Sequence, residues 1–199
     1  MKVISFEGFE YSGKSTQIKL LKKYFIKNNI KSTFTREPGG NKDLEKIRNV
    51  ILKSNFDNLS LIMFFFASRF ALLSSIKKSD FIVFDRFFDS TYAYQKYNSK
   101  EKKLIISLIK LIDKKFIPKI TFYLKLDKKN LMRRKNKRLY SNKFDKKYFG
   151  QFSRIQKNYE EISKIKIGER KFVAIDASLS ANEVHDKIIL NLKKCKLIK

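Results

Sequence analysis

A glycine-framed segment near the start of the chain has the residue types needed to hold a polyphosphate. Residues 8–16 read Gly-Phe-Glu-Tyr-Ser-Gly-Lys-Ser-Thr and fit the pattern G-x-x-x-x-G-K-[ST]. In such a loop the backbone N–H groups converge on the phosphates, and the following helix directs its positive end to the same place. Lys14 would reach the β- and γ-phosphates, and Ser15 would ligate Mg²⁺. The alternative is a glycine turn that matches the pattern by chance. The residues expected to bind a nucleoside triphosphate here are Gly8, Phe9, Glu10, Tyr11, Ser12, Gly13, Lys14, Ser15 and Thr16.

Two further groups of polar residues come directly after apolar runs. Arg36-Glu37-Pro38-Gly39-Gly40 is the first, and Asp85-Arg86 is the second. In phosphate-loop proteins an Asp at the end of an apolar strand is linked to Mg²⁺, so we expect Asp85 to share a metal site with Ser15. Arg36 and Arg86 could clamp a second phosphate through their planar forks, or they could be surface cations in weak salt bridges. The chain has nine Arg and 37 Lys, so Arg at both strand ends favours the clamp.

These groups need a scaffold that brings strand ends together. Apolar and β-branched runs predict strands at 3–6, 31–35, 81–84, 120–126 and 172–175. Helical spacing predicts helices around 18–25 and over 42–53, 57–77, 100–114, 127–138, 147–166 and 180–193. The alternation predicts a single α/β domain over residues 1–199, with a doubly wound, five-stranded parallel sheet of the P-loop type. Ligands bind such open sheets at the carboxyl ends of the strands, where the polar groups lie.

Composition excludes several classes of protein. One Cys and one His, Cys195 and His185, rule out a disulfide within the chain and a Cys/His zinc site, and they make a His- or Cys-based nucleophilic enzyme a poor fit. Met1 and Lys2 lead straight into an apolar run and no long apolar segment follows, so we expect a cytoplasmic protein without a signal peptide or membrane span.

The net charge of +27, from 46 Lys and Arg against 19 Asp and Glu, has two interpretations. A nucleic-acid partner would explain it. So would compositional drift, because Lys, Ile, Phe and Asn are abundant while Gly (6) and Pro (2) are scarce. The basic residues are spread over the whole chain rather than clustered, so we favour drift and expect no nucleic-acid partner.

Five motifs, taken in order, resemble those of the thymidylate kinase family over nearly the whole chain. They are Phe6-Glu7-Gly8-x-Glu10-x-x-Gly13-Lys14-Ser15-Thr16; Thr35-Arg36-Glu37-Pro38-Gly39-Gly40, continued by Glu45-x-Ile47-Arg48; Phe65-x-Ala67-x-Arg69; Asp85-Arg86-Phe87 with Ser90-Thr91-x-Ala93-Tyr94-Gln95; and Ile175-Asp176-Ala177. The family usually has Tyr at the position of Phe87.

The resemblance implies transfer of the γ-phosphoryl group of ATP to dTMP, with Mg²⁺, giving dTDP and ADP for dTTP synthesis. It implies that dTMP is bound by Glu10, Arg36, Phe65, Arg69, Arg86, Thr91, Tyr94 and Gln95, and that Lys14, Glu10 and Arg86 act in catalysis. Phe65 would stack on thymine, Arg69 would hydrogen-bond a base carbonyl, and Tyr94 would fill the place of a ribose 2′-hydroxyl. As alternatives, Phe65 or its neighbour Phe66 packs in the core, and Tyr94 is plain packing. Asp89 could cap the helix after the third strand.

The family's mobile lid would correspond to residues 134–150. The phosphate loop lacks the Arg that some members carry, so a lid Arg would supply the remaining positive charge, as in the bacterial-type members. We expect Arg138 to be this catalytic, ATP-binding residue, with Arg134 second, although both could be a solvated basic face. Residues 142–145 match the family's Asp-Arg pair and following acid only partly, with Lys in place of Arg. Arg154 is a further candidate for ATP contact.

Three other hypotheses remain open at this stage. The chain could be a kinase for another nucleotide or a nucleoside, a nucleic-acid-binding NTPase drawn by its charge, or an inactive member that keeps only the fold. Members of the family are homodimers packed through helices, and the aromatic-rich helix at 57–77 fits such an interface.

Overall fold

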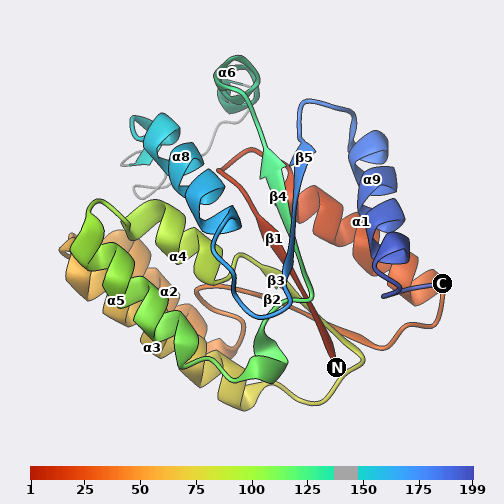
Figure 1. Cartoon of the computed structure of the whole chain (residues 1–199), viewed down its shortest axis with the longest axis horizontal. Helices are drawn as coiled ribbons and strands as arrows, with labels where there is room; N and C mark the ends of the chain where they lie inside the picture. The colour runs from red at the N-terminus through yellow and green to blue at the C-terminus, as the bar shows by residue number, and fades with distance from the viewer. Residues whose placement is uncertain (137–147) are drawn as a thin grey trace.

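A five-stranded parallel sheet forms the centre of the molecule (Figure 1). The computed structural model describes residues 1–136 and 148–199. The strands are β1 (Lys2–Glu7), β2 (Ser32–Arg36), β3 (Phe81–Asp85), β4 (Ile120–Lys125) and β5 (Lys171–Asp176), and their order across the sheet is β2-β3-β1-β4-β5. All four strand pairs are parallel, which confirms the predicted doubly wound α/β class.

Helices cover both faces of the sheet. Figure 1 shows α1 (Lys14–Lys27) and α9 (Ala181–Lys194) on one face. The other face carries α2 (Lys42–Lys53), α3 (Asn58–Ser75), α4 (Phe88–Gln95), α5 (Ser99–Lys110) and α8 (Phe152–Ser163). A 3₁₀ turn, η1 (Lys114–Phe116), precedes β4, and α6 (Lys128–Asn136) follows it. The predicted helix at 100–114 therefore ends early, because its last residues form the separate turn η1.

Local sequence explains where most helices begin. Asn41 and Asp57 accept hydrogen bonds at the starts of α2 and α3, and Asn98 and Ser180 form capping boxes at α5 and α9. Helix α1 differs, because its N-cap is a glycine whose φ is +95° and no side chain caps it. Its first N–H groups are thus left for a ligand or for water.

Helix α3 is the most apolar helix among the described residues. By length and composition alone it could cross a membrane, with a mean hydropathy of 1.4, which the sequence analysis did not anticipate. Core helices of globular proteins pass the same test, and α3 packs Leu61, Ile62 and Phe66 into the interior. It also carries Arg69, which is buried in an ion pair with Glu37 of the β2–α2 loop, so this part of the helix packs against protein.

The sheet register aligns the residues that the sequence analysis singled out. Asp85, the last residue of β3, lies opposite Phe6 of β1 and Arg36 of β2. Three strand ends therefore meet at one edge, and the phosphate loop leaves from the central strand between β3 and β4. This edge is the place where open α/β sheets bind ligands.

Candidate active site

The phosphate loop is a tight curl between β1 and α1. Gly8 has φ +140°, and a Cβ there would lie 2.7 Å from the carbonyl oxygen of Leu124, so only glycine fits. Tyr11 takes φ +63°, a left-handed conformation that is uncommon for a bulky residue and is typical of strained functional loops. The Lys14 ammonium lies within the curl and donates to the carbonyl oxygens of Gly8 (2.9 Å) and Phe9 (3.0 Å). Burial lowers the pKa of Lys14 to about 8, with nearby Arg86 contributing.

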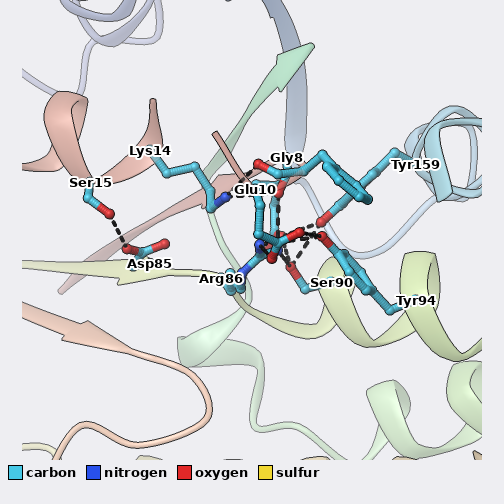
Figure 2. Close-up of polar contacts among 11 residues, drawn as sticks. Gly8, Glu10, Lys14, Ser15, Asp85, Arg86, Ser90, Tyr94 and Tyr159 are labelled. Atoms are coloured by element: carbon cyan, nitrogen blue, oxygen red, sulfur yellow. Dashed lines mark hydrogen bonds and ion pairs between the residues drawn. The ribbon is translucent and has the colours of Figure 1, made fainter. Parts of the chain in front are cut away.

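Two oxygen donors lie beside the loop. The Ser15 hydroxyl donates to the Asp85 carboxylate at 3.3 Å (Figure 2). A hydroxyl and a carboxylate fit Mg²⁺, which takes one or two protein oxygens and completes its shell with water and substrate phosphates. Among the residues that the structure describes, no group of three or more His, Cys, Asp or Glu forms a denser metal cage. The donor set therefore suits a nucleotide-bound ion rather than a permanently held one.

Arg86 is the hub of the site. Its guanidinium pairs with Glu10 and donates to the Gly8 carbonyl and the Ser90 hydroxyl, each at 3.0 Å (Figure 2). The Tyr94 hydroxyl donates to the other Glu10 oxygen at 2.7 Å. Burial raises the pKa of Glu10, but Arg86 and Lys14 outweigh this and hold that pKa below its ordinary value. Arg86 itself takes φ +69°, so the backbone also aims it at the phosphate loop.

A pocket opens next to Arg86 and Glu10. Its lining brings together seven of the residues expected to bind dTMP: Glu10, Phe65, Arg69, Arg86, Thr91, Tyr94 and Gln95. These residues come from the phosphate loop, α3 and the β3–α4 region, which are distant in the chain. Glu37, Pro38, Arg48, Leu52, Phe87 and Ser90 complete the wall. The pocket therefore combines an aromatic surface with several polar groups, as small-molecule sites do.

Arg69 is held so that one nitrogen remains for a ligand. Its Nε donates to Glu37 at 2.7 Å and its Nη2 to the Thr91 hydroxyl at 2.9 Å. Its Nη1 has no partner in the described structure, and neither has Oε1 of Glu37, although both atoms are buried. Burial raises the pKa of Glu37 to about 7, although the adjacent Arg69 opposes the shift. Buried donors and acceptors without partners indicate a binding site.

Arg36 lies apart from this pocket. Its guanidinium is more than half exposed and makes a bidentate pair with Glu45, at 3.0 and 2.7 Å, over a neighbouring depression that Asp85 also lines. Arg48, twelve residues further along the same motif, lies on the pocket wall and donates to the Pro38 carbonyl at 2.7 Å. Burial lowers the pKa of Arg48, and the positive charges of Arg36 and Arg86 lower it further.

A second cavity lies on the α1 side of the phosphate loop. Its wall contains residues 11–17, Arg134 and the segment after β5. Arg134 donates to the Tyr11 carbonyl at 3.0 Å and also to the Ala177 carbonyl. The cavity thus joins six of the nine expected loop residues to Arg134, one of the two expected lid arginines. Arg138 and residues 142–145 fall outside the described residues, so the expectations about them stay predictions.

Several residues have roles that the sequence analysis did not assign. Glu7 is fully buried at the end of β1, where it accepts from the Phe87 N–H at 2.7 Å and the Ser90 hydroxyl at 2.5 Å. Burial, with a contribution from Asp89, raises the pKa of Glu7 to about 8. Glu7, Glu37 and Arg48 all lie within the quoted motifs; the available signal was a carboxylate at or just after a strand end for Glu7 and Glu37, and motif membership alone for Arg48 on α2.

Two minor expectations are corrected. Asp89 does not cap α4; the N-cap position is Phe87, and Asp89 instead pairs with Arg170 in the interior. The Arg154 guanidinium is directed at the end of α4, where it donates to the carbonyls of Lys96 (2.9 Å) and Tyr94 (3.0 Å), and it does not line the cavity beside α1. Both side chains thus anchor α4, the helix that carries Thr91, Tyr94 and Gln95.

Comparison with known proteins agrees with this arrangement. A family profile described as thymidylate kinase matches residues 6–188. Among curated relatives, a thymidylate kinase of Chlorobium limicola is 35% identical, over 96% of this chain and 94% of that protein. One of Wolbachia pipientis subsp. Culex pipiens is 36% identical, over 97% and 96% of the two chains. The crystal structure of thymidylate kinase from Ehrlichia chaffeensis superimposes with a TM-score of 0.71 and 30% identity, covering 96% and 98% of the chains. The chain therefore belongs to the thymidylate kinase family.

Proposed function

We propose that the protein transfers the γ-phosphoryl group of ATP to dTMP, giving dTDP and ADP. The observation that carries this proposal is a pair of cavities, one lined by the phosphate loop and one by the aromatic pocket, with Arg86 on the pocket wall and hydrogen-bonded to Gly8 of the loop. One cavity contains the phosphate loop, and the other is an aromatic pocket with unpartnered polar atoms. A kinase needs two phosphate-bearing substrates whose phosphates approach each other, and Arg86 lies where they would meet.

In the acceptor pocket, each side chain has a distinct role in this proposal. Phe65 stacks on the thymine ring, and the unpartnered Nη1 of Arg69 donates to a base carbonyl. Tyr94, fixed by its hydrogen bond to Glu10, fills the space where a ribose 2′-hydroxyl would lie and so favours a deoxynucleotide. Arg86 and Arg48 hold the 5′-phosphate. Arg36 joins them as a phosphate ligand when its pair with Glu45 opens on binding.

On the donor side, backbone N–H groups of residues 8–16 and the uncapped start of α1 receive the ATP phosphates. Lys14 leaves its two carbonyl partners to pair with the β- and γ-phosphates, and a nearby polyanion returns its pKa toward the ordinary value. Arg134, on the wall of the same cavity, contributes to ATP binding. Arg138 supplies the arginine finger.

The reaction needs alignment more than covalent help from the protein. An oxygen of the dTMP phosphate, already deprotonated near neutral pH, attacks the γ-phosphorus, and the bond to the β–γ bridging oxygen breaks as ADP leaves. Ser15 and Asp85 would hold Mg²⁺, which when bound neutralises charge on the β- and γ-phosphates. Glu10 keeps Arg86 directed between the two substrates, and Lys14 and Arg86 place positive charge beside the transferring group.

Arg86 and Arg48 should make the acceptor pocket discriminate between dTMP and thymidine, because only dTMP carries the 5′-phosphate that they bind. With ATP and Mg²⁺ in excess, ADP release should depend on dTMP and should be lower by at least about 10³-fold with thymidine, which lacks the clamped group. Equal turnover of both acceptors would show that Arg86 and Arg48 do not bind the acceptor phosphate.

We also propose a cytoplasmic homodimer packed through α2 and α3. Large apolar side chains remain exposed on these adjacent helices: Ile47, Val50, Leu59, Met63 and Phe64. A patch of this kind marks a protein interface. Sedimentation should give twice the 23.7 kDa chain mass, and Phe64→Glu should give the monomer; a wild-type monomer at micromolar concentration would contradict the proposal.

A further inference from the structure

Gln95 reaches the pocket at the end of α4 with one half of its amide already engaged. Its Nε2 donates to the Tyr148 hydroxyl at 3.0 Å. Both side chains are almost completely buried, and the Tyr148 ring packs edge-on against Tyr94 at 5.2 Å between centroids. Tyr148 is not part of the pocket wall and belongs to none of the five motifs, so neither of these features assigns it a role.

A chain of hydrogen bonds fixes which way the Gln95 amide faces. An Arg side chain can only donate, and Arg154 donates to Oε1 of Gln151 at 2.5 Å. The Tyr97 hydroxyl donates to the same oxygen at 2.9 Å, so its own proton is used there. The Tyr148 hydroxyl is also hydrogen-bonded to Tyr97. Because the Tyr97 proton is committed to Gln151, Tyr148 donates to Tyr97 and its oxygen accepts from Gln95.

The Tyr148 hydroxyl keeps its proton. Burial raises the pKa of this hydroxyl, so the proton remains available for the bond to Tyr97. Each link therefore has one donor and one acceptor, and the amide nitrogen of Gln95 is held away from a ligand.

We propose that Tyr148 is a specificity-determining positioning residue that makes Gln95 present its amide oxygen to the base. An oxygen accepts from the N3–H of thymine or uracil, whereas cytosine has an acceptor at N3 and would face it oxygen to lone pair. The series of hydrogen bonds that begins at Arg154 thus makes the pocket select a base that donates a hydrogen bond from N3. This inference rests on the proposed function, because it assumes that the pocket binds a pyrimidine nucleotide.

Tyr148→Phe keeps the packed ring and deletes only the hydroxyl. The kcat/KM ratio of dTMP to dCMP should fall about tenfold or more, the range expected when one hydrogen-bond preference is lost. The loss should lie in KM, with kcat for dTMP within about twofold. The ratio of dTMP to dUMP should not change, because both bases donate at N3. Loss of stability alone would lower all acceptors together.

Tyr92→Phe is the matched control. It deletes another buried hydroxyl that links α4 to α8, through Glu161 at 2.8 Å, and it should leave the dTMP to dCMP ratio unchanged. Tyr97→Phe, at a half-exposed position, breaks the next link and should lower the ratio in the same direction but less. It provides the test if Tyr148→Phe does not fold. An unchanged ratio in Tyr148→Phe, or in Tyr97→Phe where only that variant folds, would overturn the proposal, whereas failure of the wild type to phosphorylate dTMP would overturn the function on which it rests.

Discussion

The donor cavity takes its shape from one stretch of sequence, whereas the acceptor pocket is assembled from parts that are distant in the chain. Residues 8–16 bend through two glycines and offer backbone N–H groups, so little depends on the rest of the fold. The pocket instead needs side chains from the β2–α2 loop, α2, α3 and α4. Its polar groups are oriented by buried pairs such as Glu37 with Arg69. A backbone site can therefore be recognised from a motif, but a side-chain site depends on the packing of several elements.

The same difference predicts which variants affect chemistry and which affect acceptor binding. Donor-side substitutions should change turnover and leave dTMP affinity intact. Acceptor-side substitutions should weaken dTMP binding and leave the rate of the chemical step intact.

Lys14→Ala should abolish turnover, with a loss of at least about 10³-fold in kcat, because no other side chain in the curl of the loop places a cation on the γ-phosphate. Single-turnover ADP formation measures the loss. Calorimetric dTMP affinity is the control and should change by less than about threefold. A kcat within tenfold of the wild type would contradict the assignment of the donor site.

Substitution of Arg138 and of Arg134 should affect different kinetic constants. Arg138→Ala should lower kcat by about 10³-fold or more, as removal of an arginine finger does. Arg134→Ala should mainly raise the KM for ATP, because this residue lies on the cavity wall beside Tyr11. Steady-state kinetics with varied ATP distinguishes them, and the exposed Arg133→Ala is the matched control. Full kcat in Arg138→Ala would mean that the finger lies elsewhere.

Arg69→Ala should weaken dTMP binding by about 10- to 100-fold and leave the KM for ATP within twofold, because its one unpartnered nitrogen faces the acceptor. It should also destabilise the fold by about 3 kcal/mol, since Glu37 would remain buried without its cation. Calorimetry and urea unfolding measure the two effects. Unchanged dTMP affinity in a folded variant would exclude Arg69 from base recognition.

Glu7 directly precedes the phosphate loop and accepts from Ser90 of the acceptor pocket, and it should make stability depend on pH. Its folded pKa of about 8, and that of about 7 for Glu37, exceed the ordinary value of 4.5. Between pH 4.5 and about 8 the folded state therefore holds more protons, and the free energy of unfolding should fall as pH rises, by at most about 1.4 kcal/mol per pH unit for each group. Above about pH 8 this loss is complete.

Glu7→Gln keeps an acceptor for the Phe87 N–H, places an amide N–H against the Ser90 hydroxyl oxygen, and removes the titration, so its stability should vary less between pH 5 and 8. Urea unfolding at several pH values tests this. A wild-type stability that rises over this range would contradict the assignment of a protonated, buried Glu7.

The fold class and the donor motif could both be predicted from the sequence, but for different physical reasons. Alternating apolar runs and helical spacings reflect burial, which is local enough to predict five parallel strands. The strand order, the end of α5 before η1, and the uncapped start of α1 depend on tertiary packing. None of these can be obtained from periodicity.

For the site residues, the sequence motifs predicted which residues take part, whereas their orientation depends on contacts made in the fold. Arg69 and Gln95 could be named from motifs, but their orientation comes from Glu37 and Tyr148, each of which lies more than 30 positions away along the chain. Arg48 and Arg36 belong to neighbouring motif segments, and only the fold shows that Arg48 lies on the pocket wall. Roles that arise from contacts between distant elements were not accessible from the sequence.

The most direct test of the two-cavity account is the acceptor profile of the purified protein. With ATP and Mg²⁺ at moderate salt, ADP release is followed after separate addition of dTMP, dCMP, dAMP, dGMP, DNA or RNA. The account predicts turnover selective for dTMP, with dTDP as the product and no stimulation by nucleic acid. ADP release that needs no nucleotide acceptor and is stimulated by DNA or RNA would contradict it, and would assign a function to the net charge of +27.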